Sequence, residues 1–299
     1  MKRFLKRAAI GLLILGAAVA GLFAWNGLST AWRTPDAGVT NHPAAIERPP
    51  ALRVLAWNIA KGGAHFGGTT FRSPDSARAF LDRIAALIRD QRADIVFLSE
   101  TMHECGPCPV DQPAYLAEAA GFHAWAFGAN YRWGLPFYRI VNGIAVLSRF
   151  PLRPVETVQL EGERPFYDPK GNRRMLWVEI DLAGEPLTAA SVWLDSGNSE
   201  NRLVQARSVV DRLEGRPALL AGDFNCPPAS PEMAVFRDSG LFVADFEAKD
   251  PSFPARGPEQ RIDHVLGPRG WTHRSTVVVH DEELSDHRPV LAEFDLPAR

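Results

Sequence analysis

The sequence of 299 residues predicts an α/β protein in which two β-sheets pack face to face, with helices on their outer sides. Two observations lead to this prediction. Many short apolar runs, often without alternation, are typical of buried strands. Only a few segments have the apolar spacing of an amphipathic helix. Strands therefore outnumber helices by too much for a doubly wound nucleotide-binding fold, and two stacked sheets bury such runs better.

The first 25 residues have the composition of a membrane segment. Residues 1–7 are basic, and residues 8–25 carry no charge, close to the ~20 residues that span a bilayer. The basic flank should stay in the cytoplasm, so we expect the rest of the chain to face outward. Ala18-Val19-Ala20 has the form of a signal-peptidase site, but apolar residues continue past it to Trp25. We therefore favour an uncleaved signal anchor with an extracytoplasmic domain; cleavage would give a secreted protein.

Residues 26–50 have the composition of a linker. They hold four prolines and lack a periodic apolar pattern. The remaining segment, residues 51–299, is long enough for one large domain and has no internal repeat of the kind that solenoids and propellers show. We expect a single anchored domain that is monomeric.

Within this domain the spacing of apolar residues predicts each element in turn. Residues 52–57 predict a strand that Asn58 follows, and residues 76–91 and 200–213 predict amphipathic helices. A shorter helix is predicted at residues 113–120. The other predicted strands are residues 94–98, 143–147, 175–182, 187–194, 217–221, 262–266, 276–279 and 290–294.

The charge balance argues weakly against a nucleic-acid-binding protein. Of 33 basic residues, four lie in the first seven positions, so 29 remain against 35 acidic residues in the rest of the chain. Proteins that bind long nucleic acid without sequence preference usually carry the opposite balance. One local basic stripe would suffice for such binding, so the net charge alone does not exclude a nucleic-acid substrate.

Cys105-Gly106-Pro107-Cys108 has the spacing of the thioredoxin redox motif. That motif opens a helix directly after a strand, whereas Pro109 follows at once here. In an exported domain we therefore expect a loop disulfide between Cys105 and Cys108. A redox pair, or a zinc site with His103, stays open, although a fourth zinc ligand is not evident. Cys226 reads as a small apolar filler.

Polar side chains follow two of the predicted strands. Glu100 emerges at the end of the strand at residues 94–98, where a carboxylate suits Mg²⁺ or Mn²⁺. Asn58 follows the first strand, and its amide can bind a phosphate oxygen or orient a carboxylate. Either residue alone is also consistent with a solvated loop or a simple turn.

A third cluster, Asp223 and Asn225, follows the strand at residues 217–221. Gly222 permits close backbone approach at the strand end. Because residues two apart in an extended segment point to the same side, we expect Asp223 and Asn225 to share one phosphoryl group. The alternative is an Asx turn without a catalytic role.

A fourth cluster joins two carboxylates to a histidine. Asp263 lies within a predicted strand, and a half-buried carboxylate needs a partner, for which His287 is the natural candidate. A carboxylate on one ring nitrogen fixes the tautomer and raises the basicity of the other. His287 can then act as a general base or as a phosphate ligand, with Asp286 as a metal-side carboxylate. His264 should face the opposite side of the strand and be structural.

Carboxylates and amides at strand ends, with one histidine, are what metal-assisted phosphoester hydrolysis needs. Six motifs in chain order resemble the endonuclease/exonuclease/phosphatase superfamily, which includes deoxyribonuclease I, apurinic endonucleases, sphingomyelinases and inositol-polyphosphate 5-phosphatases. The resemblance spans residues 52–294 and implies a four-layer α/β sandwich, a divalent metal on the glutamate and cleavage of a phosphoester by activated water. The motifs are Trp57-Asn58-Ile59, Leu98-Ser99-Glu100, residues 143–151, Gly222-Asp223-Phe224-Asn225, Arg261-Ile262-Asp263 and Ser285-Asp286-His287.

Two positions depart from the pattern of the family. Many members carry a histidine where this chain has Trp193, and some carry an acid or asparagine where it has Ala60. Metal binding would then depend on Glu100 and Asp286. Three basic residues are spare candidates for phosphate binding, or ordinary surface charges: Lys61, Arg139 and Arg174.

These observations together predict a Mg²⁺- or Mn²⁺-dependent phosphoester hydrolase. Asp223 and His287 would handle the water and the leaving group, Asp263 would orient His287, and Asn58 and Asn225 would hold the phosphate. An outward-facing anchor and an acidic domain favour a lipid headgroup or a small phosphoester as substrate, with nucleic acid open.

The alternative is a catalytically inactive, membrane-anchored binding module that retains the fold. Trp193 and Ala60 motivate it. The clustered charges argue against it, because an inactive site has no physical need for them.

Overall fold

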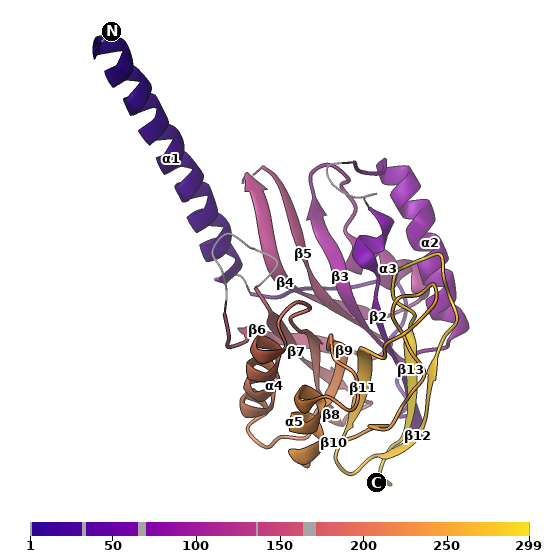
Figure 1. Ribbon diagram of the computed structural model, residues 1–299. Helices are drawn as coiled ribbons and strands as arrows, with labels where there is room; N and C mark the ends of the chain where they lie inside the picture. The colour runs from indigo at the N-terminus through magenta and orange to yellow at the C-terminus, as the bar shows by residue number, and fades with distance from the viewer. Residues whose placement is uncertain (1, 32–33, 65–69, 136, 164–171, 299) are drawn as a thin grey trace.

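The computed structural model describes residues 2–31, 34–64, 70–135, 137–163 and 172–298. Two mixed β-sheets pack face to face, and helices cover the outer side of each (Figure 1). This arrangement confirms the predicted fold class. The layers, from one outer face to the other, are helices, a seven-stranded sheet, a six-stranded sheet and further helices.

The seven-stranded sheet consists of strands from the N-terminal half of the domain, with the last two strands of the chain at one of its edges. Its parallel pair is formed by the second and third strands of the chain, and the other neighbours are antiparallel. In spatial order it consists of β1 (Asp36–Val39), β4 (Ala124–Leu135), β5 (Tyr138–Ser148), β3 (Ile95–Cys105), β2 (Ala51–Asn58), β13 (Val290–Asp295) and β12 (Thr272–Val278).

The six-stranded sheet is built from the second half of the chain. It too contains one parallel pair, which places the C-terminal ends of two strands side by side at one edge. In spatial order it consists of β10 (Phe242–Val243), β11 (Asp263–Pro268), β9 (Leu219–Asp223), β8 (Pro186–Trp193), β7 (Arg174–Asp181) and β6 (Leu152–Gln159).

The unalternating apolar runs are explained by burial on both faces. In β2, Val54 and Ala56 point into the layer between the sheets, whereas Leu55 and Trp57 point to the outer layer. A strand covered on both sides loses the usual alternation of polar and apolar residues. The central strands were predictable for this reason.

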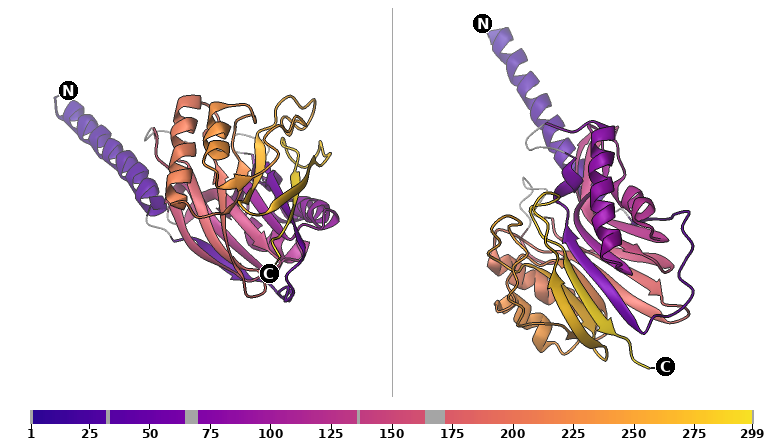
Figure 2. Two further views of the ribbon diagram at one scale, coloured as in Figure 1. Left: turned by 90° about the horizontal axis from the view of Figure 1, so that it is seen from below. Right: turned by 90° about the vertical axis from the view of Figure 1, so that its right-hand side faces the viewer.

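Helices α2 (Pro74–Asp90) and α3 (Gln112–Ala120) cover one outer face, and α4 (Ser199–Leu213) and α5 (Pro231–Asp238) cover the other (Figure 2). Each begins at a residue whose side chain accepts a hydrogen bond from the first turn: Ser73, Asp111, Asn198 and Ser230. A short 3₁₀ helix, η1 (Ala60–Gly63), follows β2.

The N-terminal helix α1 (Lys2–Ala31) projects away from the sandwich and contacts it only near its C-terminal end (Figure 1). Residues Arg3–Leu28 are long and apolar enough to cross a membrane. The helix thus extends past residue 25, and β1 pairs with β4 inside the segment predicted to be a linker. The division of the chain at residues 25 and 50 stays a prediction, but this part of the linker belongs to the sheet.

The prediction of a disulfide was wrong. Cys105 and Cys108 are both free, buried thiols, as is Cys226. Cys105 is the last residue of β3, and the backbone N–H of Cys108 donates to its carbonyl oxygen in a tight turn (3.0 Å). Burial raises the pKa of the Cys105 thiol to about 11, so the thiolate needed for redox exchange is disfavoured as well.

Candidate active site

Side chains from both sheets meet at one edge of the sandwich. Asn58 is the last residue of β2, Asp223 is the last residue of β9, and Asp263 is the first residue of β11. Asp223 and Asp263 are directly opposite in the antiparallel β9–β11 pair. Strand termini from the two halves of the chain therefore place three buried polar side chains in one location.

Asn58 bridges the two sheets. Its Nδ2 donates to Asp223 Oδ2 (3.1 Å) and lies 3.3 Å from Glu100 Oε1 as a second acceptor. Its Oδ1 accepts from the backbone N–H of Ala60 (3.0 Å), which fixes the amide orientation. Asn58 thus connects a carboxylate of the first sheet to a carboxylate of the second.

Asp263 and His287 form a buried pair. His287 Nδ1 donates to Asp263 Oδ2 at 2.9 Å, and the Ser252 hydroxyl donates to the same oxygen at 2.7 Å. The ring of Phe253 packs against the imidazole with centroids 4.6 Å apart. The carboxylate and the aromatic ring together restrict His287 to one orientation.

The loop that carries His287 is tied to β2. Trp57 Nε1 donates to the carbonyl oxygen of His287 (2.9 Å), and the Ser285 hydroxyl donates to the carbonyl oxygen of Asn58 (2.6 Å). The backbone N–H of Ala255 donates to the carbonyl oxygen of Asp286 (2.7 Å). The side chain of Asp286 stays exposed at the rim, next to the buried His287.

Burial and neighbouring charges shift the pKa values of the two central titratable groups, His287 and Asp223. Burial disfavours the imidazolium of His287, but the charges of Asp263, Asp223 and Asp286 outweigh it and raise its pKa to about 10. Burial and the charge of Asp263 raise the pKa of Asp223 to about 7, against the opposing effect of His287. These shifts favour the imidazolium of His287 at neutral pH and hold the pKa of the Asp223 carboxyl above its ordinary value.

Glu100 lies at a bulge and not at a strand end, so that part of the prediction was wrong. β3 continues to Cys105, and its register with β5 shifts between Leu98 and Thr101. Glu100 itself has φ 56°, a left-handed conformation that is uncommon for a residue with a side chain. The bulge turns the Glu100 carboxylate toward Asn58, with which it is in hydrogen-bond contact.

Lys61 is the unexpected partner of Glu100. Its ammonium donates to Glu100 Oε2, and both side chains are largely buried. Burial opposes ionisation of Glu100, but the lysine charge and the hydrogen bonds from Lys61 and Asn58 outweigh it and lower the pKa of the carboxyl. Lys61 had been a candidate phosphate ligand; in the structure it neutralises the predicted metal ligand.

The donor set fits a divalent cation. Ligand atoms of Asp223, Asp263 and His287 lie within 4.8 Å of one another. Asp263 Oδ1 is buried without a hydrogen-bond donor among the described residues, and the Glu100 carboxylate already binds a cationic group. The carboxylate oxygens of Glu100, Asp223 and Asp263 are hard donors, the type that Mg²⁺ and Mn²⁺ prefer, whereas His287 offers a ring nitrogen.

Asn225 is held differently from the prediction. The strand ends at Asp223, and Asn225 has φ 52°, so the two residues do not belong to one extended segment. Asp223 Oδ1 accepts from the backbone N–H of Asn225 (2.9 Å), which is an Asx turn, and Asn225 Nδ2 donates to the carbonyl oxygen of Leu194 (3.0 Å). The turn still places Asn225 beside the catalytic candidate Asp223.

The two departures lie at the site. Trp193 pairs with Asp223 in the parallel β8–β9 register, so a large aromatic residue borders the aspartate, and the guanidinium of Arg173 stacks on its ring at 4.1 Å. Ala60 offers only its backbone N–H, which Asn58 accepts. Neither position supplies a side-chain acid or base.

Two spare phosphate candidates do not belong to the site. Arg139 pairs with Glu104 near the far end of β3, and the buried Arg174 donates to the carbonyl oxygens of Thr30 and Thr157. Arg174 is therefore structural. No motif marked Ser252 or Phe253, which contact the Asp263–His287 pair from the loop that precedes β11.

Solved structures with the same architecture confirm the fold. An endonuclease/exonuclease/phosphatase from Beutenbergia cavernae DSM 12333 matches with a TM-score of 0.67 at 27% identity, over 83% of this chain and 72% of that one. A mannosyl-6-phosphatase from Bacteroides thetaiotaomicron VPI-5482 matches at 0.59 and 20% identity, over 81% and 99%. Sphingomyelinase C from Streptomyces griseocarneus matches at 0.53 and 20%, over 82% and 99%. No match was found among curated proteins.

Two mixed sheets with an Asp–His pair, a second aspartate and a glutamate at one edge define a deoxyribonuclease I-like sandwich. The profile of the endonuclease/exonuclease/phosphatase family matches residues 55–287. The chain belongs to this family, whose members are generally phosphoester hydrolases.

Proposed function

We propose that this protein hydrolyses a phosphoester with the help of Mg²⁺ or Mn²⁺. The observation that carries the proposal is one continuous chain of contacts, from Glu100 through Asn58 to Asp223, beside the buried Asp263–His287 pair. A stable fold does not require so many buried charges in one place, because each costs desolvation. Their convergence supports catalysis.

The raised pKa of His287 supports a role in binding phosphate. An imidazolium at neutral pH donates hydrogen bonds and carries positive charge, which suits a phosphoryl oxygen and its growing charge in the transition state. Asp263 holds the ring by Nδ1 and leaves Nε2 for the substrate. Asn225 would offer its second amide N–H to the same phosphoryl group, and Asn58 would orient the Asp223 and Glu100 carboxylates to which it donates.

Asp223 is then the group that accepts a proton from water. Its pKa of about 7 suits a general base at physiological pH, since it combines ionisation with useful basicity. Glu100 and Asp286 would hold the cation. When bound there, a divalent cation polarises a phosphoryl oxygen and lowers the pKa of the attacking water.

The N-terminal helix supports a membrane-anchored protein with its catalytic domain outside the cytoplasm. Such a position favours a lipid headgroup or a small phosphoester as the substrate. Nucleic acid is the alternative that the acidic balance of the domain disfavours.

The second candidate function is an inactive, anchored binding module. The contact that favours it is the pairing of Lys61 with Glu100, together with Trp193 and Ala60 at positions where relatives carry polar groups. A lysine that stays on Glu100 in the presence of Mg²⁺ would leave the carboxylate unable to bind the ion.

The test is a hydrolysis assay of the full chain with Mg²⁺ on phospholipid vesicles, a soluble phosphomonoester, plasmid DNA and single-stranded DNA. We expect turnover of at least one substrate, lost in Glu100→Gln and His287→Ala and kept in His280→Ala, which changes an exposed histidine. Turnover that survives Glu100→Gln would contradict the metal role. Absence of turnover and of Mg²⁺ binding would favour the binding module.

A further inference from the structure

The outer end of the β4–β5 hairpin presents a group of exposed apolar side chains, which we call the hairpin tip. It consists of Trp133, Leu135, Phe137 and Tyr138, whose exposed fractions are 37%, 46%, 85% and 54%. Elsewhere in the described part of the domain, large exposed apolar residues stand on separate elements, as Val155, Val204 and Val277 do. Several large apolar side chains at the end of one hairpin mark a surface that is covered in the working protein.

The hairpin tip lies beside the candidate membrane span. The rings of Phe23 and Trp133 are in edge-to-face contact with centroids 4.9 Å apart. Arg174 also donates to the carbonyl oxygen of Thr30, which fixes the end of α1 against the sheet. Figure 1 shows the hairpin and α1 projecting from the same end of the sandwich.

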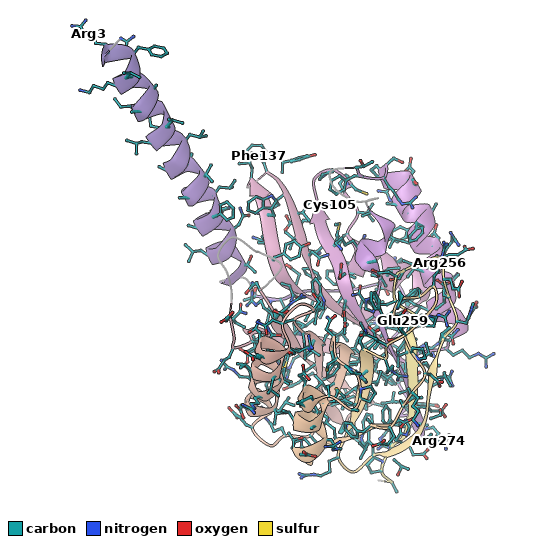
Figure 3. All side chains as sticks on the ribbon, in the orientation of Figure 1. Arg3, Cys105, Phe137, Arg256, Glu259 and Arg274 are labelled. Atoms are coloured by element: carbon teal, nitrogen blue, oxygen red, sulfur yellow. The ribbon has the colours of Figure 1, made fainter. Side chains whose placement is uncertain are left out.

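The contact fixes the depth of the tip relative to the span. Phe23 lies inside Arg3–Leu28, about 7.5 Å of helix before its end at ~1.5 Å per residue. Trp133 contacts Phe23 and so lies at that depth. Phe137 lies farther toward the turn, at the outer end of the hairpin in Figure 3. If α1 spans a bilayer, Phe137 cannot remain in water.

We propose that the hairpin tip inserts into the bilayer beside α1, in the leaflet nearest the domain. Trp and Tyr flanking an apolar Phe and Leu suit the boundary between headgroups and acyl chains, because an aromatic ring with one polar atom is stabilised there. Insertion at two points, α1 and the tip, would hold the domain in one orientation on the membrane. The proposal does not depend on the proposed enzymatic function.

The experiment places an environment-sensitive label at the tip of the full chain in nanodiscs of phosphatidylcholine and phosphatidylglycerol. Phe137→Cys is labelled with a nitrobenzoxadiazole dye; the three native cysteines are buried. Val277→Cys, an exposed position on β12, is the matched control. Tyr138→Cys, labelled in the same way, keeps Phe137 in place and gives a second measurement of the environment of the hairpin tip.

We expect the emission at positions 137 and 138 to shift to the blue and to be quenched by lipids that carry a nitroxide on the acyl chain. The label at position 277 should show neither effect. Emission at positions 137 and 138 that matches position 277 in folded protein would overturn the proposal. A blue shift without lipid quenching would overturn it too, because protein, such as a second copy of the chain, would then cover the tip.

Discussion

His287 is the residue in which burial, charge and hydrogen bonding are most closely linked. Asp263 lies on its Nδ1, and Asp223 contributes a second negative charge to its environment. A histidine that stays protonated above neutral pH binds phosphate better than it accepts a proton from water. The roles that we propose for His287 and Asp223 depend on the difference between their pKa values.

Asp263→Asn should shift the alkaline limb of the pH–kcat/KM profile to lower pH. Removing the carboxylate charge lowers the pKa of His287 from about 10, so the imidazolium is lost earlier as the pH rises. The free energy of unfolding of the wild-type protein should depend on the protonation of His287 in the same pH range. The pair stabilises the fold fully below the ordinary pKa of 6.5, and this contribution is lost as the pH rises through about 10.

The matched control for this change is Asp75→Asn, which alters an exposed aspartate in the first turn of α2. It should leave both pH profiles unchanged. An alkaline limb that stays in place in Asp263→Asn would show that His287 is not the group that titrates there.

The acidic limb of the wild-type profile should reflect Asp223. Its pKa is raised to about 7, so the ionised form that accepts a proton accumulates as the pH rises through that value. Activity should therefore increase from pH 5 to 8. The measurement is kcat/KM against pH at saturating Mg²⁺, and a flat profile over this range would contradict the role of Asp223.

Lys61→Met should tighten Mg²⁺ binding. The ammonium occupies Glu100 Oε2, and a cation must displace it to reach the carboxylate. A hydrogen bond to a charged group is worth roughly 1.5 kcal/mol, which corresponds to about a tenfold lower Kd. Isothermal titration with Mg²⁺ measures this, with the exposed Lys249→Met as control. An unchanged Kd would place the ion away from Glu100.

The sequence was informative about single residues where chemistry demanded a partner. A half-buried Asp263 predicted a contact with His287, and the structure has that hydrogen bond. The sequence could not reveal that Lys61 reaches Glu100, because the contact depends on positive φ angles at Lys61 and Glu100. The contact of Ser252 with Asp263 could not be predicted either, because Ser252 lies in a loop that has no recognisable motif.

At the scale of elements, close approach of β8 and β9 positions Asp223. Gly222 has φ 145°, and a Cβ atom there would lie 2.0 Å from the carbonyl oxygen of Val192. The sequence predicted this close approach from the glycine at the end of the strand. Asp223 follows directly, so the geometry of the site depends on a backbone position that only glycine can occupy.

Gly222→Ala should lower both stability and activity. The methyl group forces β9 away from β8, and we expect a loss on the order of 2 kcal/mol or more in the free energy of unfolding. Activity should fall further than the folded fraction does, because Asp223 moves with the strand. Gly197→Ala is the control, as nothing lies closer than 3.8 Å to its added Cβ. Urea unfolding and kcat measured on folded protein check both effects, and a stability equal to that of Gly197→Ala would contradict the close approach.

Strands with polar or proline-containing sequences were not predictable. β6 contains Pro154 and alternates in exposure, and it lies at the sheet edge, where a missing N–H donor is tolerated. β4 mixes Gly128, Asn130 and Arg132 with aromatic residues, yet all three are buried by neighbouring segments. Tertiary packing decided these elements, and no local pattern carries that information.

At the scale of the whole molecule, the fold class followed from the sequence because the core has three apolar layers. Each central strand contributes to two of them, so the runs are apolar throughout. The orientation of the domain relative to α1 could not be predicted, since it depends on the contact of Phe23 with Trp133. That contact places the hairpin tip at the end of the sandwich from which α1 projects.

This orientation leads to an expectation about the substrate. The full chain in vesicles should hydrolyse a long-chain phospholipid in the same membrane at least about tenfold faster than a soluble short-chain analogue, because anchoring raises the effective concentration. Initial rates at equal bulk substrate concentration measure the difference. Equal rates, or a preference for DNA, would contradict a membrane-borne substrate.

The central claim is that distant segments of the chain form one cation-binding phosphoester site. Anomalous diffraction from crystals soaked in Mn²⁺ tests it most directly. We expect a peak at coordination distance, about 2.1 Å as for Mg²⁺, from the Glu100 carboxylate, with the Lys61 ammonium displaced. A crystal that binds Mn²⁺ elsewhere, or not at all, with Lys61 still paired to Glu100 would contradict it.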